Sequence, residues 1–157
     1  MGANELANDL ERAREELFGI LATVTPDSMA TPGLVGEWSA RDLIAHLGYW
    51  AGHATEVIHL AEQGRIDDIG VGEPSVDETN ATVARIAGQT DLATVRKREA
   101  ASVEALTARL AALDPALFVL RLPDGATLEE GIAEDAGDHY REHLDELRRV
   151  LGDAARA

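Results

Sequence analysis

The chain has 157 residues, of which 45% are hydrophobic, and a formal net charge of −15. This length and composition predict one folded domain, residues 1–157, with enough apolar material for a core. A surface this acidic repels phosphate backbones, so we expect no nucleic-acid partner. The chain has no cysteine, which excludes disulfides, thiolate metal sites and a cysteine nucleophile. It also lacks a long apolar run and a signal-peptide pattern, so we expect no membrane association and a cytoplasmic location.

The first half of the chain predicts two long amphipathic helices. Apolar residues recur every three or four positions from Leu6 to Val24 and stop at Pro26. Residues 25–36 contain proline and glycine and predict a loop. A second helix opens at Ser39, which has a capping-box spacing with the acid three residues later, and ends near Gly64.

The second half predicts two further long helices after a crossover loop over residues 64–74. Residues 76–87 are compatible with a short helix, and a long helix runs from a cap at Asp91 to the Asp114-Pro115 break. Residues 117–122 fit either an extended segment or a helical turn. A last helix opens at Thr127, in a second capping box, and runs to about Leu151. The fold class is therefore all-α, a four-helix bundle with one long crossover connection, or five helices if residues 76–87 form a full element.

Two histidines interrupt the apolar stripe of the last helix. His139 and His143 lie one turn apart, about 40° apart around the helix axis, where leucine or valine is expected. Buried polar groups need a hydrogen bond or a metal. Neighbouring side chains can satisfy two core histidines, but the i, i+4 spacing also allows both rings to bind one ion.

The second helix offers a third ligand. His46 lies at the edge of its apolar face, so that His46, His139 and His143 together make the three-ligand set of a zinc-like site with one open position. His53 lies about 10 Å further along the same side, too far to share the ion, and is expected to line a cavity. His59 faces away and is expected to be exposed.

Two acids precede these histidines by one turn. Asp42 comes four residues before His46, and Asp135 comes four residues before His139. Either carboxylate can accept the ring N–H of a ligand and fix its tautomer. Alternatively, Asp42 is a helix-start acid and Asp135 is a solvated surface charge.

Two segments of the sequence resemble the DinB-like metalloprotein superfamily. The first is Gly36-Glu37-Trp38-Ser39-Ala40-Arg41-Asp42-Leu43-Ile44-Ala45-His46-Leu47-Gly48-Tyr49-Trp50, and the second is Asp138-His139-Tyr140-Arg141-Glu142-His143. The resemblance covers nearly the whole chain. It implies a four-helix bundle in which His46, His139 and His143 bind a divalent ion. In the mycothiol-dependent maleylpyruvate isomerase branch the second ligand is commonly Glu; His139 here is closer to the general and thiol-transferase pattern.

The same resemblance implies a function. The family includes mycothiol-dependent maleylpyruvate isomerase and the bacillithiol S-transferases, so we expect a metal-dependent thiol S-transferase or isomerase. Zn or Ni would activate a low-molecular-weight thiol such as mycothiol, or water, and the partners would be a small-molecule substrate and that thiol. The alternative is a non-catalytic metal- or small-ligand-binding stress or resistance protein of the same fold. Dimerisation is common in the family, so a homodimer is the assembly implied.

Overall fold

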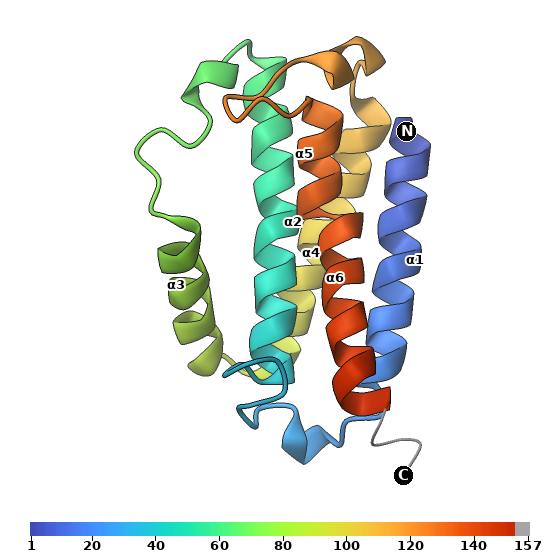
Figure 1. Ribbon diagram of the computed structural model, residues 1–157, viewed down its shortest axis with the longest axis vertical. Coiled ribbons are helices and arrows are strands. Elements are labelled where there is room, and N and C mark those ends of the chain that lie inside the picture. Colours follow the sequence, from blue (N-terminus) through green and yellow to red (C-terminus); the bar gives the residue numbers. More distant parts are fainter. Residues whose placement is uncertain (153–157) are drawn as a thin grey trace.

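The computed structural model describes residues 1–152 and is mainly helical (Figure 1). Its α-helices are α1 (Ala3–Leu21), α2 (Ala40–Glu62), α3 (Val76–Gly88), α4 (Leu92–Ala112), α5 (Leu128–Asp135) and α6 (Gly137–Leu147). Over the described residues, extended structure is limited to two isolated bridges. The bundle is formed by α1, α2, α4 and the α5–α6 pair, which confirms the all-α class and the long crossover between α2 and α4.

The helix starts follow the polar residues that the sequence offers as caps. Ser39 and Asp42 form a reciprocal capping box at the start of α2, and Thr127 and Glu130 form another at the start of α5. Asp91 accepts a hydrogen bond from the Thr94 backbone and begins α4. Each cap satisfies backbone N–H groups that have no partner inside the helix, so the beginnings of these helices are the best-predicted boundaries.

The core lies along the axis of the bundle. Side chains from four helices are among those that are fully buried: Leu10 and Leu17 of α1, Leu43 of α2, Leu106 of α4 and Ile132 of α5. Their spacing of three, four or seven residues within each helix places one apolar face of every bundle helix against the others. Across residues 1–152, no helix combines the length and the apolarity needed to cross a bilayer.

The structure differs from the sequence prediction at the last helix. A continuous helix from Thr127 to Leu151 was expected, but α5 and α6 are separated at Ala136, whose φ of −116° and ψ of −107° are not helical. α6 ends at Leu147 and a π-helical turn, Arg148–Gly152, follows. The break changes the rotational phase of the helix, so residues before and after it no longer share the face that a regular helix would give them.

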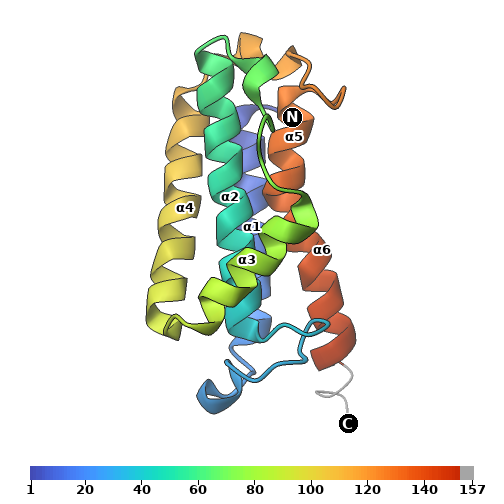
Figure 2. The same ribbon diagram turned by 90° about the vertical axis from the view of Figure 1, so that its left-hand side faces the viewer.

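Two segments that the sequence left open are now defined. Residues 76–88 form a full helix, α3, which crosses the outside of α2 (Figure 2). Counting α5 and α6 as one interrupted helix, the described chain therefore has five helical elements. The apolar segment before α5 is mainly a 3₁₀ turn, Pro115–Val119, and Arg121 then forms an isolated bridge with Thr127.

Candidate metal centre

Three histidines from two helices converge on one point. The Nε2 atoms of His46 and His139 are 2.8 Å apart, and the Nε2 atoms of His143 and His139 are 3.2 Å apart. One ligand nitrogen from each of the three residues lies within 4.8 Å of the others, a spacing that can hold a metal ion. The structure thus brings together the three histidines predicted from the sequence.

The cluster is withdrawn from water, and its imidazoles are neutral. His46 is 5% exposed and His143 is 8% exposed, while His139 is intermediate. Burial, and then the proximity of the other two histidines, lowers the pKa of His46 to about 3. Burial and His143 lower the pKa of His139 to about 4, and burial also lowers the pKa of His143. Neutral imidazoles have a free nitrogen lone pair, which is the form that binds metals.

The three histidines cannot satisfy the hydrogen-bonding capacity of one another's ring nitrogens. An imidazole Nε2 carries either one proton or one lone pair in the ring plane, so the Nε2 of His139 forms at most one good hydrogen bond with its two neighbours. The Nδ1 atoms of His46 and His143 are buried without a hydrogen-bond partner. Glu146 Oε1 lies 3.4 Å from His143 Nδ1, close enough for electrostatic attraction but not in hydrogen-bond geometry. The converging Nε2 atoms cannot all be paired with one another, and the Nδ1 atoms of His46 and His143 have no partner in the protein, which fits a metal site better than a closed core network.

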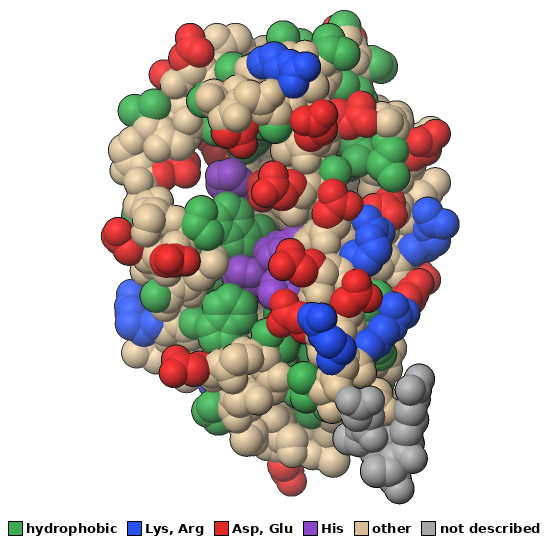
Figure 3. All heavy atoms as spheres, in the orientation of Figure 1, with side chains coloured by type: hydrophobic (Ala, Val, Ile, Leu, Met, Phe, Trp, Pro, Cys, Tyr) green, Lys and Arg blue, Asp and Glu red, His purple; other side chains and the backbone are tan. Residues whose placement is uncertain are grey.

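Aromatic side chains just before α2 and in its middle flank the cluster. The ring of Trp38 lies 4.5 Å from that of His46, measured between centroids. Trp50 lies one turn beyond His46 and donates a hydrogen bond of 2.9 Å from Nε1 to Asn80 Oδ1 on α3. Figure 3 shows histidine and hydrophobic side chains together in a hollow between α3 and the α5–α6 pair. A ligand entering this hollow would therefore meet aromatic walls and a nitrogen-rich floor.

His53 occupies a different position, as predicted. It lines the large cavity between α2, α3 and α4 and is not one of the converging histidines. Its Nδ1 lies 2.6 Å from Asp135 Oδ2, and its Nε2 lies 3.9 Å from Glu73 Oε2. The hydrogen bond to Asp135 is the main reason why the pKa of His53 is raised.

Neither of the two candidate carboxylates pairs with a ligand histidine. Asp135 pairs with His53, not with His139, because the break at Ala136 changes the phase between α5 and α6. Asp42 caps α2 by accepting from the Ser39 backbone N–H, so its alternative role as a helix-start acid is correct. His59 lies outside the cluster, as expected, but is half-buried rather than exposed and contacts Gln63.

Sequence reasoning missed a second buried polar cluster, which is centred on Glu99 of α4 and reaches Tyr140 of α6. Glu99 is 1% exposed and accepts two hydrogen bonds of 2.7 Å from Arg14 and one of 2.6 Å from the Tyr140 hydroxyl. The signal was available, since Glu99 interrupts the apolar stripe of α4 between Val95 and Leu106. Every oxygen of this carboxylate has a partner, so the cluster is a structural link among α1, α4 and α6.

Comparison with solved structures supports the fold. An uncharacterised protein from Escherichia coli UTI89 superposes with a TM-score of 0.82 at 15% sequence identity, covering 98% of this chain and 95% of that one. At this identity the likeness concerns the fold alone. The search of curated proteins found no match.

Comparison with protein families identifies the chain. Residues 10–129 match the mycothiol maleylpyruvate isomerase N-terminal domain. The matched segment contains His46 and the caps of α2 and α4, whereas His139 and His143 lie beyond its end. The match covers most of the chain and agrees with the helical architecture, so this protein belongs to the DinB-like family of mycothiol maleylpyruvate isomerase N-terminal domains.

Proposed function

We propose that this protein is a metal-dependent enzyme of the thiol S-transferase or isomerase type. The observation that carries the proposal is that one ring nitrogen each of His46, His139 and His143 converges on one largely buried point, where the three nitrogens cannot all be paired with one another. Family membership supports a small thiol, mycothiol or a similar molecule, as cosubstrate. The chain has no cysteine, so a thiol nucleophile must come from outside the protein.

The donor set fits a divalent transition metal such as Zn²⁺ or Ni²⁺. Three neutral imidazoles are typical ligands of these ions and leave positions for a further ligand. When bound, the ion would lower the pKa of a coordinated thiol or water and so supply a nucleophile near neutral pH. None of the three imidazole ligands is anionic, so they would leave the positive charge of the metal ion without a counter-charge. This charge favours binding of a thiolate.

The remaining residues of the hollow provide binding and orientation. Trp38 packs against the His46 ring and restricts its rotation. The Trp50–Asn80 hydrogen bond ties α2 to α3 beside the cluster, so the aromatic wall is fixed before a substrate arrives. These contacts exclude water from one side of the histidines, which strengthens electrostatic interactions there.

The test combines metal analysis with a turnover assay. Purified protein is expected to bind about one divalent ion per chain, and to consume a model electrophile only when both the metal and mycothiol or a surrogate thiol are present. The His143→Ala variant should lose both properties. His59→Ala is the matched control, since His59 lies on α2 outside the cluster.

The outcomes separate the two functional hypotheses. Metal binding without thiol-dependent turnover would contradict the enzyme proposal and favour the alternative, a non-catalytic metal- or ligand-binding protein. Turnover that survives chelation and His143→Ala would contradict the metal centre itself.

A further inference from the structure

A large cavity lies outside the histidine cluster. It has a volume of about 630 Å³, within the usual range of small-molecule sites, is open to solvent on one side, and is lined mainly by α2, α3 and α4. Small residues of α2 and α4 form its floor, among them Gly48, Gly52, Ala101 and Ser102. None of His46, His139 and His143 lines it.

Close packing of α2 on α4 creates the floor of this cavity. A Cβ atom at Gly48 would lie 2.9 Å from the Cα of Glu99, so only glycine permits this approach. A Cβ atom at Gly52 would lie 3.6 Å from Ser102 Oγ, an ordinary contact. The two helices thus form a trough of small residues, which is flanked by the larger side chains that also line the cavity, such as Tyr49 and Arg98.

The opposite wall of the cavity is α3, a helix of which few side chains are buried. α3 turns Val83, Ile86 and Ala87 toward the cavity, but only Ala87 is buried, and Ile86 remains 45% exposed. Figure 2 shows α3 crossing in front of α2. An apolar helix face over an unfilled cavity can gain hydrophobic contact from an apolar ligand.

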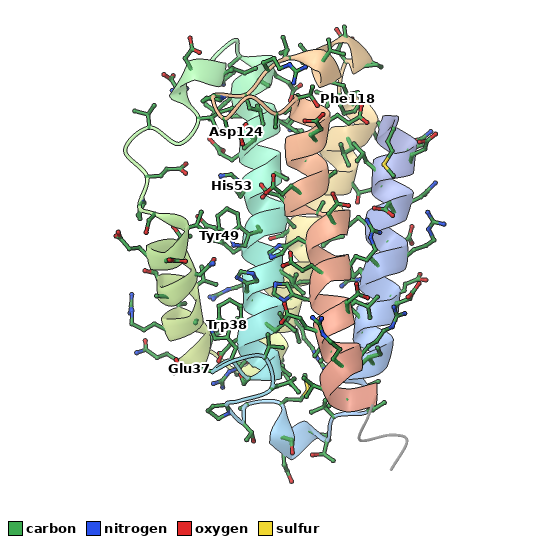
Figure 4. All side chains as sticks on the ribbon, in the orientation of Figure 1. Glu37, Trp38, Tyr49, His53, Phe118 and Asp124 are labelled. Carbon is green, nitrogen blue, oxygen red and sulfur yellow. The ribbon has the colours of Figure 1, made fainter. Side chains whose placement is uncertain are left out.

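One end of the cavity is acidic. Glu56 and Glu73 line it beside His53 and Tyr49, which project from α2 toward α3 (Figure 4). Asp135 holds the far side of the His53 ring. Burial raises the pKa of the Tyr49 hydroxyl, and Glu73 and Asp135 raise it further, as expected where the potential is negative.

The basic groups of the cavity do not cancel this charge. Arg98 is exposed and lies on α4 beside Glu99, at the level of Gly48 rather than of His53. Glu99 directs its carboxylate away, to Arg14 and Tyr140. At the His53 end the lining thus carries two carboxylates, Glu56 and Glu73, and one imidazole that is already paired with Asp135 outside the cavity, which favours a cationic ligand group and disfavours an anionic one.

We propose that this cavity is a second ligand site, for a small amphipathic amine. The apolar body of the ligand lies between α3 and the α2–α4 trough, and its protonated amine lies beside Glu73 and Glu56. The site does not depend on the metal centre, because no residue of the histidine cluster contributes to it. It therefore stands or falls separately from the proposed enzyme function.

The test compares three probes that share a phenylalkyl body and carry a cationic, a neutral or an anionic end group. Binding of 4-phenylbutylamine, 4-phenylbutanol and 4-phenylbutanoate to the metal-free full chain is measured by calorimetry or ligand-observed NMR. The amine should bind about fivefold more tightly than the alcohol, and the acid more weakly than both. Equal affinities for the amine and the acid, or no binding of any probe, would overturn the proposal.

Two pairs of variants locate the binding. Ala101→Phe places a ring in the cavity and should abolish binding, whereas Ala100→Phe, on the neighbouring exposed position that does not line it, should not. Glu73→Gln should remove the preference for the amine and keep binding of the alcohol. Glu104→Gln, which removes an equal charge from an exposed position of α4 outside the cavity, should change neither.

The same variants identify a competing occupant. If a second copy of the chain covers the cavity, sedimentation will show a dimer that Ala101→Phe converts to a monomer, and the probes will not bind. That result would overturn the amine site. Unchanged amine binding in both Ala101→Phe and Glu73→Gln would show that the amine binds elsewhere on the acidic surface, and would also overturn it.

Discussion

Two buried polar clusters lie on different sides of α6 and are built on opposite principles. In the first, Glu99 is surrounded by Arg14 and Tyr140, which satisfy both of its oxygens. In the second, three imidazoles face one another while two of their nitrogens have no partner. One cluster is complete in the protein alone, and the other is not.

Whether its buried polar atoms are paired distinguishes a cluster that only stabilises the fold from one that can bind a ligand. This criterion needs no comparison with related proteins. A charged side chain that is fully paired stabilises one arrangement of helices, because removing either partner leaves a buried charge. Polar atoms that are buried, close together and unpaired cost stability unless something else binds them. The protein tolerates this cost at the histidines, and the following predictions test that contrast.

The largest loss of stability is expected from Arg14→Met. This change leaves the Glu99 carboxylate with Tyr140 as its remaining partner and should lower the free energy of unfolding by about 3 kcal/mol. Denaturation with urea measures the effect. Arg12→Met, two residues away at an exposed position, should change it by less than about 0.5 kcal/mol. A similar loss in both variants would show that the Glu99 cluster has no special role.

A substitution in the histidine cluster should affect metal binding strongly and the stability of the metal-free protein little, the opposite of Arg14→Met. Because even groups that only support a metal ligand contribute 10- to 100-fold, His143→Ala should weaken metal binding by more than about 100-fold. The same variant should keep or raise the stability of the metal-free protein, since it removes an unsatisfied buried group. Competition with a chromophoric chelator gives the affinity, with His59→Ala as control. Strong destabilisation of the metal-free protein by His143→Ala would mean that the histidines are a structural cluster.

Acid should destabilise the metal-free protein through the histidine cluster. The unfolded chain protonates its imidazoles near pH 6.5, whereas in the folded state the pKa is about 3 for His46 and about 4 for His139. Between these values the unfolded state binds more protons, so stability falls as the pH is lowered from 6.5 toward 4, by up to about 1.4 kcal/mol per pH unit for each histidine.

The variant His46→Asn isolates this contribution. Its free energy of unfolding should fall less steeply with acid than that of the unmodified protein. The raised pKa of His53 acts in the reverse direction, adding stability below pH 6.5, and is common to both proteins. Parallel pH profiles for the two proteins would contradict the low pKa of His46.

The smallest effect is expected from Tyr140→Phe. The change removes one of three hydrogen bonds to Glu99 and should cost about 1 to 2 kcal/mol, since Arg14 remains paired with the carboxylate. Metal affinity should not change, although Tyr140 lies next to His139 in the chain. A loss of metal binding in Tyr140→Phe would show that the two clusters are coupled through α6.

The sequence was most informative where one residue decides a local structure. Ser39, Asp91 and Thr127 begin helices because their side chains accept backbone hydrogen bonds, and a cap needs no information from distant residues. His46, His139 and His143 were identified in the same way, as polar residues in or at the edge of apolar stripes. Their convergence followed from the bundle and from the family resemblance together.

The sequence was misleading where geometry depends on contacts between distant segments. A continuous helix was expected over residues 127–151, and neither reading of Asp135 included its bond to His53, because nothing in the residue spacing marks the break at Ala136. The residue after the break indicates why the helix is interrupted here. A Cβ atom at Gly137 would lie 2.3 Å from Asp9 Oδ2 on α1. Tertiary packing against α1 therefore sets the path of this helix, and no local pattern reports it.

Because of the break at Ala136, the two halves of one polypeptide segment have different contacts and different roles. α6 is fixed to α1 by the paired hydrogen bonds of Arg141 to Asp9, and it positions His139 and His143. α5, on the other side of the break, holds His53 through Asp135 at the edge of the amine cavity. The two halves are attached to different neighbours, so mutations in α5 can alter what the cavity recognises while the ligand histidines keep their places. Substitutions in α5 and in α6 can therefore change the cavity and the histidine cluster independently, although the two helices are consecutive in the sequence.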